Sequence, residues 1–423
     1  MTRTRLRLAY REFVGFERAL SRQIAAFREA FPHVDVEMVA YDVPELYHRM
    51  VESDGCRSGQ WDLFLCVTDW LPRLMAEEDL LALDPFLRDC PPPDWPTGWS
   101  PSLLSLQTAA DGRIHGLPYH DGPEMFMYRG DLFDDESEQE RFAATYGYPL
   151  RPPETWSQFL DVARFFTRPH DDLYGCVLAA MPDGHNSVYD FLLQLWSRGG
   201  TVLADGRAAF AGPEGREALT FLHDLIRVHK VTQPDPRAYE SVRSGDYYAS
   251  GRAAMMWNWC GFAVVADMPD SAIRGRNRLG LIPRGDGPRG RHVSLSVYWV
   301  LTIPRGCTDP ELAWEFLRHV AAPEMDLVTA REGAIGCRLS TWRDPAIQQE
   351  FASYRLIEQT HEGVETMPAI PAYPEINEVL NEEIDAVYRG EKSVEVALND
   401  AAHRTDEILA RTPDVRPTTL EGR

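Results

Sequence analysis

The first part of the chain alternates between two patterns of apolar positions, one with the period of a strand and one with the period of a helix. Leu6, Leu8 and Tyr10 are separated by single residues, which predicts a strand. Apolar side chains then recur at spacings of four, four, three and four, which predicts a helix with one apolar face. They are Phe16, Leu20, Ile24, Phe27 and Phe31. Pro32 ends this helix, and residues 34–38 alternate again as a second strand.

A nearly continuous apolar run follows at residues 61–67, which read WDLFLCV. Such a run is typical of a strand that parallel neighbours bury on both faces. Helices are predicted before it at residues 44–52 and after it at residues 71–78. The order strand, helix, strand, helix, strand predicts a doubly wound sheet, whose ligands bind beyond the carboxyl ends of the strands. The loops at these ends are residues 10–14, 41–42 and 68–70.

The next informative segment contains two short apolar runs, at residues 114–119 and 125–128, which predict two strands. A strand that carries Pro118, His120 and Glu124 is expected to leave one domain and enter another. Pockets favour the places where the chain crosses between domains.

Beyond Thr155, which lies near the cap of an amphipathic helix, the chain is rich in helices. Residues 279–283 are a second candidate crossing strand, residues 294–304 predict one apolar strand, and a third crossing is expected near Pro323. The other predicted elements are a strand at 255–259 and helices at 188–196, 213–225, 312–320, 376–387 and 393–409. Residues 412–423 are expected to form a frayed tail.

Length, charge and cysteine content narrow the class of protein. At roughly 150 residues per domain, 423 residues predict two or three domains. The net charge of -22 argues against nucleic acid as a partner, because phosphate binding requires a basic face. The seven cysteines form no CxxC pair and no zinc spacing, so we expect buried free thiols, no metal site and no cofactor.

The sequence offers no clear sign of membrane insertion or export. No apolar run reaches transmembrane length. The first residues read MTRTRLRLAYREF and lack the apolar region of a signal peptide. We therefore expect either a protein that stays inside the cell or one whose export signal is missing from this sequence.

The order of these signals resembles one known family. Over nearly its whole length the chain is similar to the family 1 extracellular solute-binding proteins of bacterial ATP-binding cassette (ABC) importers, the maltose-binding-protein-like group. The order and spacing of seven segments carry the resemblance. They read FERALSRQIAAFREAFPHVDVEM, WDLFL, DGRIHGLPYHDGPEMFMYRGDLF with PETW, GRAAMMWNW, YWVLTIPRG, DPELAWEFL and PEINEVLNEEIDAVYRGEKSVEVAL.

The resemblance implies an α/β fold of two lobes, each a doubly wound sheet flanked by helices, with three hinge crossings near Tyr119, Leu281 and Pro323. The implied lobes are residues 1–118 with 282–322, and residues 119–281 with 323–423. A sugar or oligosaccharide would bind between the lobes, and hinge closure would present it to a membrane permease. The resemblance further implies a monomer without catalytic activity, located in the periplasm or outside the cell. A cytoplasmic location is the alternative because no export signal is visible.

Sugars present hydroxyls and flat C–H faces, so a sugar site needs aromatic rings together with polar side chains. Trp257, Asn258 and Trp259 fit this need best. On a strand the two tryptophans point one way and Asn258 the other, although both rings are equally consistent with a core position. The candidate ligand-binding residues are Glu12, Phe13, Tyr41, Asp69, Trp70, His120, Glu124, Tyr189, Trp257, Asn258, Trp259, Tyr298 and Arg338.

Most of these residues also have a structural interpretation. Only one of Tyr298 and Trp299 can face a ligand, because neighbours on a strand alternate, and we favour Tyr298. Ser296, Val297 and Tyr298 stand where many family members have a glycine-rich turn, which implies an unusual ligand. The remaining alternatives are helix capping by Asp69 and by Asn186 beside Tyr189, an ion pair of Glu124 with Arg129, a core position for Phe13, and a solvated surface position for Tyr41 and for Arg338.

Three other functions are weighed against solute transport. A glycoside hydrolase would need a pair of carboxylates such as Glu124 and Asp69, but no nucleophile motif accompanies them. Tyr247 and Tyr248 could be ferric iron ligands, yet neighbours on a helix diverge by about 100 degrees. An intracellular sensor on the same fold is the third possibility, and the missing export signal motivates it.

Overall fold

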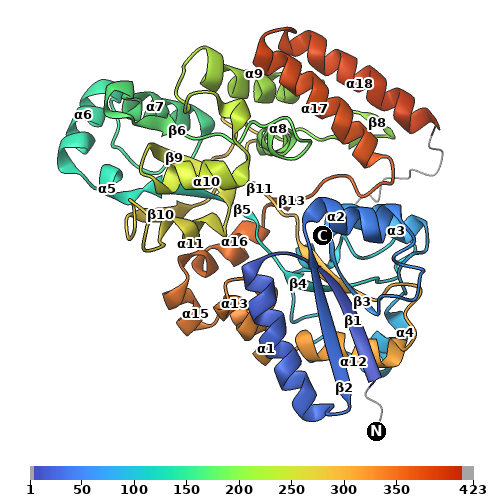
Figure 1. Ribbon diagram of the computed structural model, residues 1–423. Helices are drawn as coiled ribbons and strands as arrows, with labels where there is room; N and C mark the ends of the chain where they lie inside the picture. Colours follow the sequence, from blue (N-terminus) through green and yellow to red (C-terminus); the bar gives the residue numbers. More distant parts are fainter. Residues whose placement is uncertain (1–3, 412–423) are drawn as a thin grey trace. The chain divides into compact units, whose positions relative to one another are not determined.

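The protein folds into two compact units, each with a mixed sheet flanked by helices (Figure 1). The structure is a computed structural model that describes residues 4–411. Unit 1 comprises Met1–Gly122 and Ser296–Glu358, and unit 2 comprises Pro123–Leu295 and Gln359–Arg423. This architecture confirms the predicted α/β class. The predicted tail at 412–423 lies outside the described residues.

Unit 1 is built on a five-stranded sheet in the order β2–β1–β3–β12–β4. The strands are β1 (Thr4–Arg11), β2 (Val34–Tyr41), β3 (Leu63–Val67), β4 (Leu117–His120) and β12 (Trp299–Thr302). β1 pairs in parallel with β2 and β3, whereas β12 runs antiparallel to β3 and β4. β1, β2, β3 and β4 therefore run in one direction, and their carboxyl ends share an edge with the start of β12. β3 is buried throughout, as its apolar sequence predicted.

The helices that the sequence predicted for unit 1 lie close to the predicted positions, and four further helices among the described residues were not predicted. α1 (Val14–Ala30) buries Phe16, Leu20, Ile24 and Phe27, the apolar face that the spacing predicted. Asp42 caps α2 (Val43–Tyr47), because its Oδ1 accepts a hydrogen bond of 2.8 Å from the backbone N–H of Glu45. The other helices are α3 (Leu71–Ala76), α4 (Asp84–Asp89), α12 (Pro310–Val320), α13 (Pro323–Arg331), α14 (Leu339–Trp342) and α15 (Pro345–Glu350).

Unit 2 is built on a four-stranded sheet in the order β10–β5–β9–β6. The strands are β5 (Glu124–Arg129), β6 (Tyr174–Cys176), β9 (Ala253–Trp259) and β10 (Asn277–Gly280). β5 is antiparallel to β9 and β10, and β9 is parallel to β6. Two short ladders accompany this sheet: β11 (Ser294–Leu295) with β13 (Val364–Glu365), and β7 (Leu203–Ala204) with β8 (Arg207–Ala208).

Helices cover this second sheet and extend away from it. α7 (Trp156–Phe166) and α8 (Asn186–Ser197) contribute side chains that contact one face, and α10 (Ser241–Ala249) packs on the other. Thr155 caps α7 as predicted. α17 (Tyr373–Arg389) and α18 (Val394–Arg411) lie together and pack against α9 (Pro213–Arg227), and α17 also contacts α8 (Figure 1). The remaining helices are α5 (Gly130–Phe133), α6 (Glu136–Tyr146), α11 (Phe262–Ala266) and α16 (Ile357–His361), and the third boundary between the units falls within α16.

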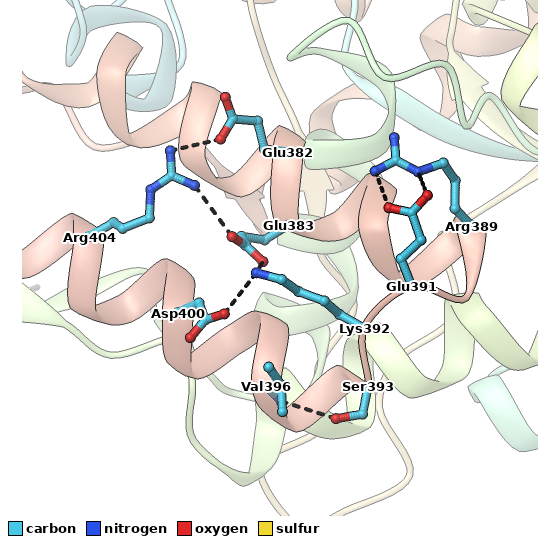
Figure 2. Close-up of polar contacts among 9 residues, drawn as sticks. All are labelled: Glu382, Glu383, Arg389, Glu391, Lys392, Ser393, Val396, Asp400 and Arg404. Atoms are coloured by element: carbon cyan, nitrogen blue, oxygen red, sulfur yellow. Dashed lines mark hydrogen bonds and ion pairs between the residues drawn. The ribbon is translucent and has the colours of Figure 1, made fainter.

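Charged side chains join α17 to α18 (Figure 2). Lys392, in the connection between the helices, bonds through Nζ to Glu383 Oε2 at 2.6 Å and to Asp400 Oδ2 at 2.7 Å. Arg404 of α18 pairs with Glu382 at 2.7 Å and with Glu383 at 3.3 Å. Glu383 is buried, and Lys392 and Arg404 are its two cationic partners. Their charges compensate for the solvation that its carboxylate loses on burial.

The boundaries between the units differ from the predicted crossings. They lie at 122/123, 295/296 and 358/359, compared with predicted positions of 118/119, 281/282 and 322/323. The third shows the largest difference because α13 packs against α1. Gln23 Nε2 donates to the carbonyl of Met325 and to Thr329 Oγ1, both at 2.9 Å. Such contacts between distant segments cannot be read from local periodicity.

The apolar run at residues 294–304 forms two strands instead of the single strand predicted. β11 belongs to unit 2 and β12 to unit 1, and residues 296–298 connect them. Ser296 Oγ donates to Asp121 Oδ1 at 2.9 Å, and the backbone N–H of Tyr298 donates to Thr68 Oγ1 at 3.2 Å. The Thr68 side chain therefore satisfies the backbone N–H of Tyr298, which a continuous ladder would otherwise have done.

Candidate functional site

The carboxyl edge of the unit 1 sheet gathers aromatic and basic side chains. Arg11 ends β1 and His120 ends β4, while Trp299 begins the antiparallel β12 and is paired with both Val67 and His120. Trp70 follows β3 in a single 3-10 turn. This is the edge at which a sheet of this kind binds ligands.

The rings at this edge pack against one another. His120 lies 5.0 Å from Phe16 and 6.1 Å from Phe13 between ring centroids. Trp299 lies 5.8 Å from Phe16 and 6.1 Å from Trp70. We call these five residues together with Arg11 the edge group. It is an aromatic cluster of unit 1 with a cation beside it, in which Phe16 and Trp299 are buried and the other rings are partly exposed.

Arg11 and His120 give the edge group its electrostatic character. The Arg11 guanidinium lies 5.6 Å from the Trp299 ring and 6.0 Å from the Phe13 ring, and within residues 4–411 it forms no ion pair. Burial lowers the pKa of Arg11. Burial also lowers the pKa of His120 to about 4, and its Nδ1 accepts the backbone N–H of Ile335 at 2.8 Å. His120 is therefore neutral at pH 7 and can exchange hydrogen bonds without carrying charge.

Three other predicted residues of unit 1 lie near this edge. Glu12 is exposed, and its backbone N–H donates to the carbonyl of Tyr41 at 2.7 Å. The Tyr41 ring lies 6.1 Å from Trp61 and 4.8 Å from the Arg49 guanidinium. Asp69 is partly buried in the turn after β3; the residue that precedes α3 is Trp70, so Asp69 is not the cap that the alternative interpretation proposed.

The preference for Tyr298 over Trp299 is not supported by the structure. Tyr298 is fully buried; its hydroxyl donates to Gln107 Oε1 at 2.7 Å and accepts the backbone N–H of Leu106 at 3.2 Å. Trp299 instead contacts the rings of the edge group. The sequence predicted correctly that the two side chains alternate, but the alternation alone could not tell which side is the interior.

Arg338 also has a structural role in place of the predicted ligand contact. Its side chain is 1% exposed and its guanidinium lies 4.3 Å from the Trp99 ring. Nη1 donates to the carbonyl of Ala321 at 2.8 Å and Nη2 to that of Pro93 at 2.9 Å. These contacts tie the loop before Trp99 to the segment after α12, so Arg338 is buried and not solvated.

In unit 2 the register of β5 and β9 places four predicted or adjacent side chains on one face. Glu124 pairs with Trp259, and Phe126 pairs with Trp257. Because side chains two residues apart share a face, Glu124, Trp257 and Trp259 point to the same side. α8 contributes Tyr189 and Asp190 there. We call Glu124, Tyr189, Asp190, Trp257 and Trp259 the carboxylate group.

Direct contacts hold the carboxylate group together. Trp257 Nε1 donates to Asp190 Oδ1 at 2.5 Å. The rings of Tyr189 and Trp259 lie 6.0 Å apart and nearly perpendicular, at 89°. Trp259 is partly exposed, whereas Glu124 and Asp190 are each 6% exposed. Glu124 Oε2 is buried and has no hydrogen-bond partner among the described residues, so one acceptor of this group is still available.

Two members of the Trp257–Trp259 segment are structural. The Trp257 ring lies 5.3 Å from Trp156 and 5.4 Å from Phe159, which makes it part of the core beneath the carboxylate group. Asn258 points to the opposite face, where its Nδ2 donates to the carbonyl of Ser241 at 2.9 Å. Trp259 is therefore the ring of this segment that is available for stacking.

Both carboxyls of the carboxylate group have raised pKa values. Burial, and secondly the nearby charge of Asp190, hold the pKa of Glu124 well above its ordinary value. Burial raises the pKa of Asp190 to about 7, although the hydrogen bond from Trp257 opposes the shift. A buried carboxyl that keeps its proton can donate as well as accept a hydrogen bond, which suits a hydroxyl-bearing ligand.

Sequence reasoning overlooked Asp190. Its signal was present, because Asp190 is the one charged residue in α8, which reads NSVYDFLLQLWS. A single acid in an apolar helix is costly to bury unless it is hydrogen-bonded or paired with a cation. The segment was predicted only as a helix, and its one charged residue was not among the candidate site residues.

The raised pKa values predict a specific pH dependence of stability. A carboxyl with a raised pKa in the folded state stabilises fully below its ordinary pKa of 3.8, and this contribution is lost as pH rises to about 7. We therefore expect the urea midpoint of the natural protein, relative to that of Asp190→Asn, to fall between pH 4 and pH 7. The asparagine still accepts the bond from Trp257, and groups such as His120, which act in the opposite sense, cancel in the difference. A difference that is constant with pH contradicts the raised pKa.

The described residues limit the other sites that could be present. Within residues 4–411 no group of three or more His, Cys, Asp or Glu side chains could hold a metal ion, and all seven cysteines are free. Tyr247 and Tyr248 of α10 are packed in an apolar cluster. A cavity of about 20 Å³, lined by Glu124, His292 and Ser294 among others, has room for one water and not for a solute.

Taken together, the fold is that of a mixed α/β protein with two sheets, each of which carries an aromatic and polar group near strand ends. This is the class of two-lobed binding proteins. The family model for bacterial extracellular solute-binding proteins matches residues 15–326, and the chain belongs to this family. Within residues 4–411 no helix is long and apolar enough to cross a membrane.

Similar proteins agree with this assignment. The arabinooligosaccharide-binding protein of Halalkalibacterium halodurans is 22% identical over 351 residues, covering 78% of this chain and 71% of that protein. The structure of maltose-bound MalE3 of T. maritima matches with a TM-score of 0.81 at 21% identity, covering 96% of this chain and 100% of that one. A solute-binding protein of an ABC transporter from Agrobacterium radiobacter K84, in complex with ribitol, also matches with a TM-score of 0.81, at 22% identity over 96% and 98% of the two chains. At these identities the structures establish the fold of this protein.

Proposed function

We propose that this protein binds a carbohydrate or polyol and delivers it to the permease of an ABC importer. The observation that carries the proposal is the carboxylate group of unit 2. There a partly exposed tryptophan, Trp259, lies beside two buried carboxyls, and one carboxyl oxygen has no hydrogen-bond partner in the part of the chain that the structure describes. Rings that stack on C–H faces and carboxyls that exchange hydrogen bonds with hydroxyls are what a sugar requires.

The edge group of unit 1 supports the proposal with a second set of suitable side chains. Arg11 can donate several hydrogen bonds to hydroxyls, and neutral His120 can donate or accept. Micromolar affinity corresponds to about -8 kcal/mol. One or two stacked rings, worth about 0.5–1.5 kcal/mol each beyond their buried area, and several hydrogen bonds of about 1 kcal/mol each can supply this after the cost of ordering.

The ligands named for similar proteins favour the same class of solute. Maltose, ribitol and an arabinooligosaccharide are all rich in hydroxyls. On the same grounds we propose an extracellular or periplasmic location and binding without chemical change of the solute. Glu124 and Asp69, the pair considered for hydrolysis, belong to separate units. Hinge closure, a permease partner and a monomeric state stay predictions.

We expect Trp259→Ala to weaken carbohydrate binding at least tenfold, because it removes the exposed ring and leaves both carboxyls in place. The experiment is a thermal-shift screen of sugars and polyols, followed by calorimetric titration of the best ligand. Trp95→Ala, which removes a partly exposed tryptophan outside both groups, is the matched control and should leave affinity unchanged. Unchanged affinity in Trp259→Ala, or a screen in which no carbohydrate binds, contradicts the proposal.

A further inference from the structure

Glu124 and Asp190 form a buried pair of acids without a cation. Within residues 4–411 no lysine, arginine or histidine forms an ion pair with either carboxyl, whereas buried Glu383 has two such partners. Trp257 Nε1 donates a hydrogen bond to Asp190, and Glu124 Oε2 has no hydrogen-bond partner within the same range of residues. The pair is therefore electrically unbalanced in a way that the other buried acids of this unit are not. Asp385, for example, pairs with Arg237 at 2.6 Å.

The elements packed around the pair present rings and hydroxyls in place of cations. β9 contributes Trp257 and Trp259, and α8 contributes Tyr189. α17 contributes Tyr388 and β6 contributes Cys176; the charge of Asp190, secondary to burial, helps to raise the pKa of both. None of these neighbours can carry a positive charge. His292 lines the same small cavity as Glu124, but within residues 4–411 it forms no ion pair with either carboxyl. The surroundings of the pair are thus mainly aromatic.

Two buried carboxyls on one face of the sheet require either a bound proton or a cation, because two bare negative charges are strongly disfavoured there. An ammonium group can balance the pair and can also contact the faces of tryptophan and tyrosine rings, which attract cations. A neutral sugar hydroxyl provides only the hydrogen bond and leaves the proton as the sole counter-charge. The observed combination of paired acids and rings is the arrangement that favours a charged nitrogen.

We propose that the solute carries a protonated amine, as in an amino sugar or an amino polyol, and that this nitrogen binds to Glu124 and Asp190 beside Trp259 and Tyr189. The inference rests on the proposed function and specifies its ligand class. When the amine binds, the proton that the two carboxyls hold leaves to solvent, and the ammonium replaces it as counter-charge. No bond of the solute is made or broken.

The test uses pairs of probes that differ in one nitrogen. Calorimetry on the full chain at pH 7 compares glucosamine with glucose, galactosamine with galactose, 1-amino-1-deoxysorbitol with sorbitol, and the glucosamine tetramer of chitosan with cellotetraose. We expect at least one amine to bind tenfold or more tightly than its neutral partner. Glu124→Gln and Asp190→Asn, which keep shape and hydrogen-bonding capacity, should each reduce that preference to threefold or less.

A second measurement does not depend on the variants folding. Titration of the natural protein in two buffers with different ionisation enthalpies reports protons exchanged on binding, and we expect net proton release with an amine and none with a neutral partner. If the neutral partners bind as tightly as the amines, or if amine binding releases no proton, this inference is overturned while carbohydrate binding stands. If no member of any pair binds, both this inference and the proposed carbohydrate binding are overturned.

Discussion

Trp257→Ala is expected to lower the free energy of unfolding by about 3–5 kcal/mol, the usual cost of removing a large aromatic side chain from a core. Trp257 is 5% exposed and packs against Trp156 and Phe159. Its loss would leave a cavity between β9 and α7 and would also remove the side-chain hydrogen bond that Trp257 donates to Asp190. Urea unfolding followed by circular dichroism measures the change.

Two further variants make this result specific. Trp257→Phe keeps most of the buried area and should cost less than the alanine variant, although Asp190 loses its donor. Trp95→Ala removes a partly exposed ring and should cost clearly less than Trp257→Ala. A loss below about 1 kcal/mol in Trp257→Ala would show that the ring is a surface platform, as one interpretation of the sequence held.

Arg338→Met should destabilise the protein by about 3–5 kcal/mol, the range for removing one partner of a buried charged network. The guanidinium binds the carbonyls of Ala321 and Pro93, and its charge also acts on the buried carboxyl of Asp326. Methionine fills similar volume but leaves these acceptors without donors.

The matched control for this prediction is Arg5→Met. Arg5 lies in the same unit, and its side chain is 64% exposed in a pair with Glu37 at 3.4 Å. Exposed ion pairs contribute about 0–1 kcal/mol, so this variant should unfold at nearly the same urea concentration as the natural protein. Equal effects of the two substitutions would mean that Arg338 is solvated, as the sequence alternative proposed.

Elements whose stability comes from local pattern could be predicted from the sequence. α1 follows from the spacing of its apolar residues, and the cap of α7 from Thr155. The boundaries between the units could not be predicted in this way. They depend on contacts between residues far apart in the chain, such as that of Gln23 with Met325. The same limit applies to the predicted single strand at residues 294–304.

The candidate site was predictable as a set of residue types and less so as an arrangement. Trp259 and Glu124 were chosen for their chemistry, and the register of β5 and β9 brings them together. Alternation showed that only one of Tyr298 and Trp299 could face a ligand, but it could not show which one. The pairing of β12 with β4 is also irregular here, because the register shifts between Trp299 and Val300. Asp190 was missed because a helix pattern draws attention to its apolar positions.

The most direct test of the account is a crystal structure of the protein with its tightest-binding carbohydrate, or amine-bearing carbohydrate, from calorimetry. The account predicts that a ring or chain of the ligand contacts the face of Trp259 and that a polar group of the ligand lies within hydrogen-bond distance of Glu124 or Asp190. Ligand density that touches neither Trp259 nor these two carboxyls would contradict it.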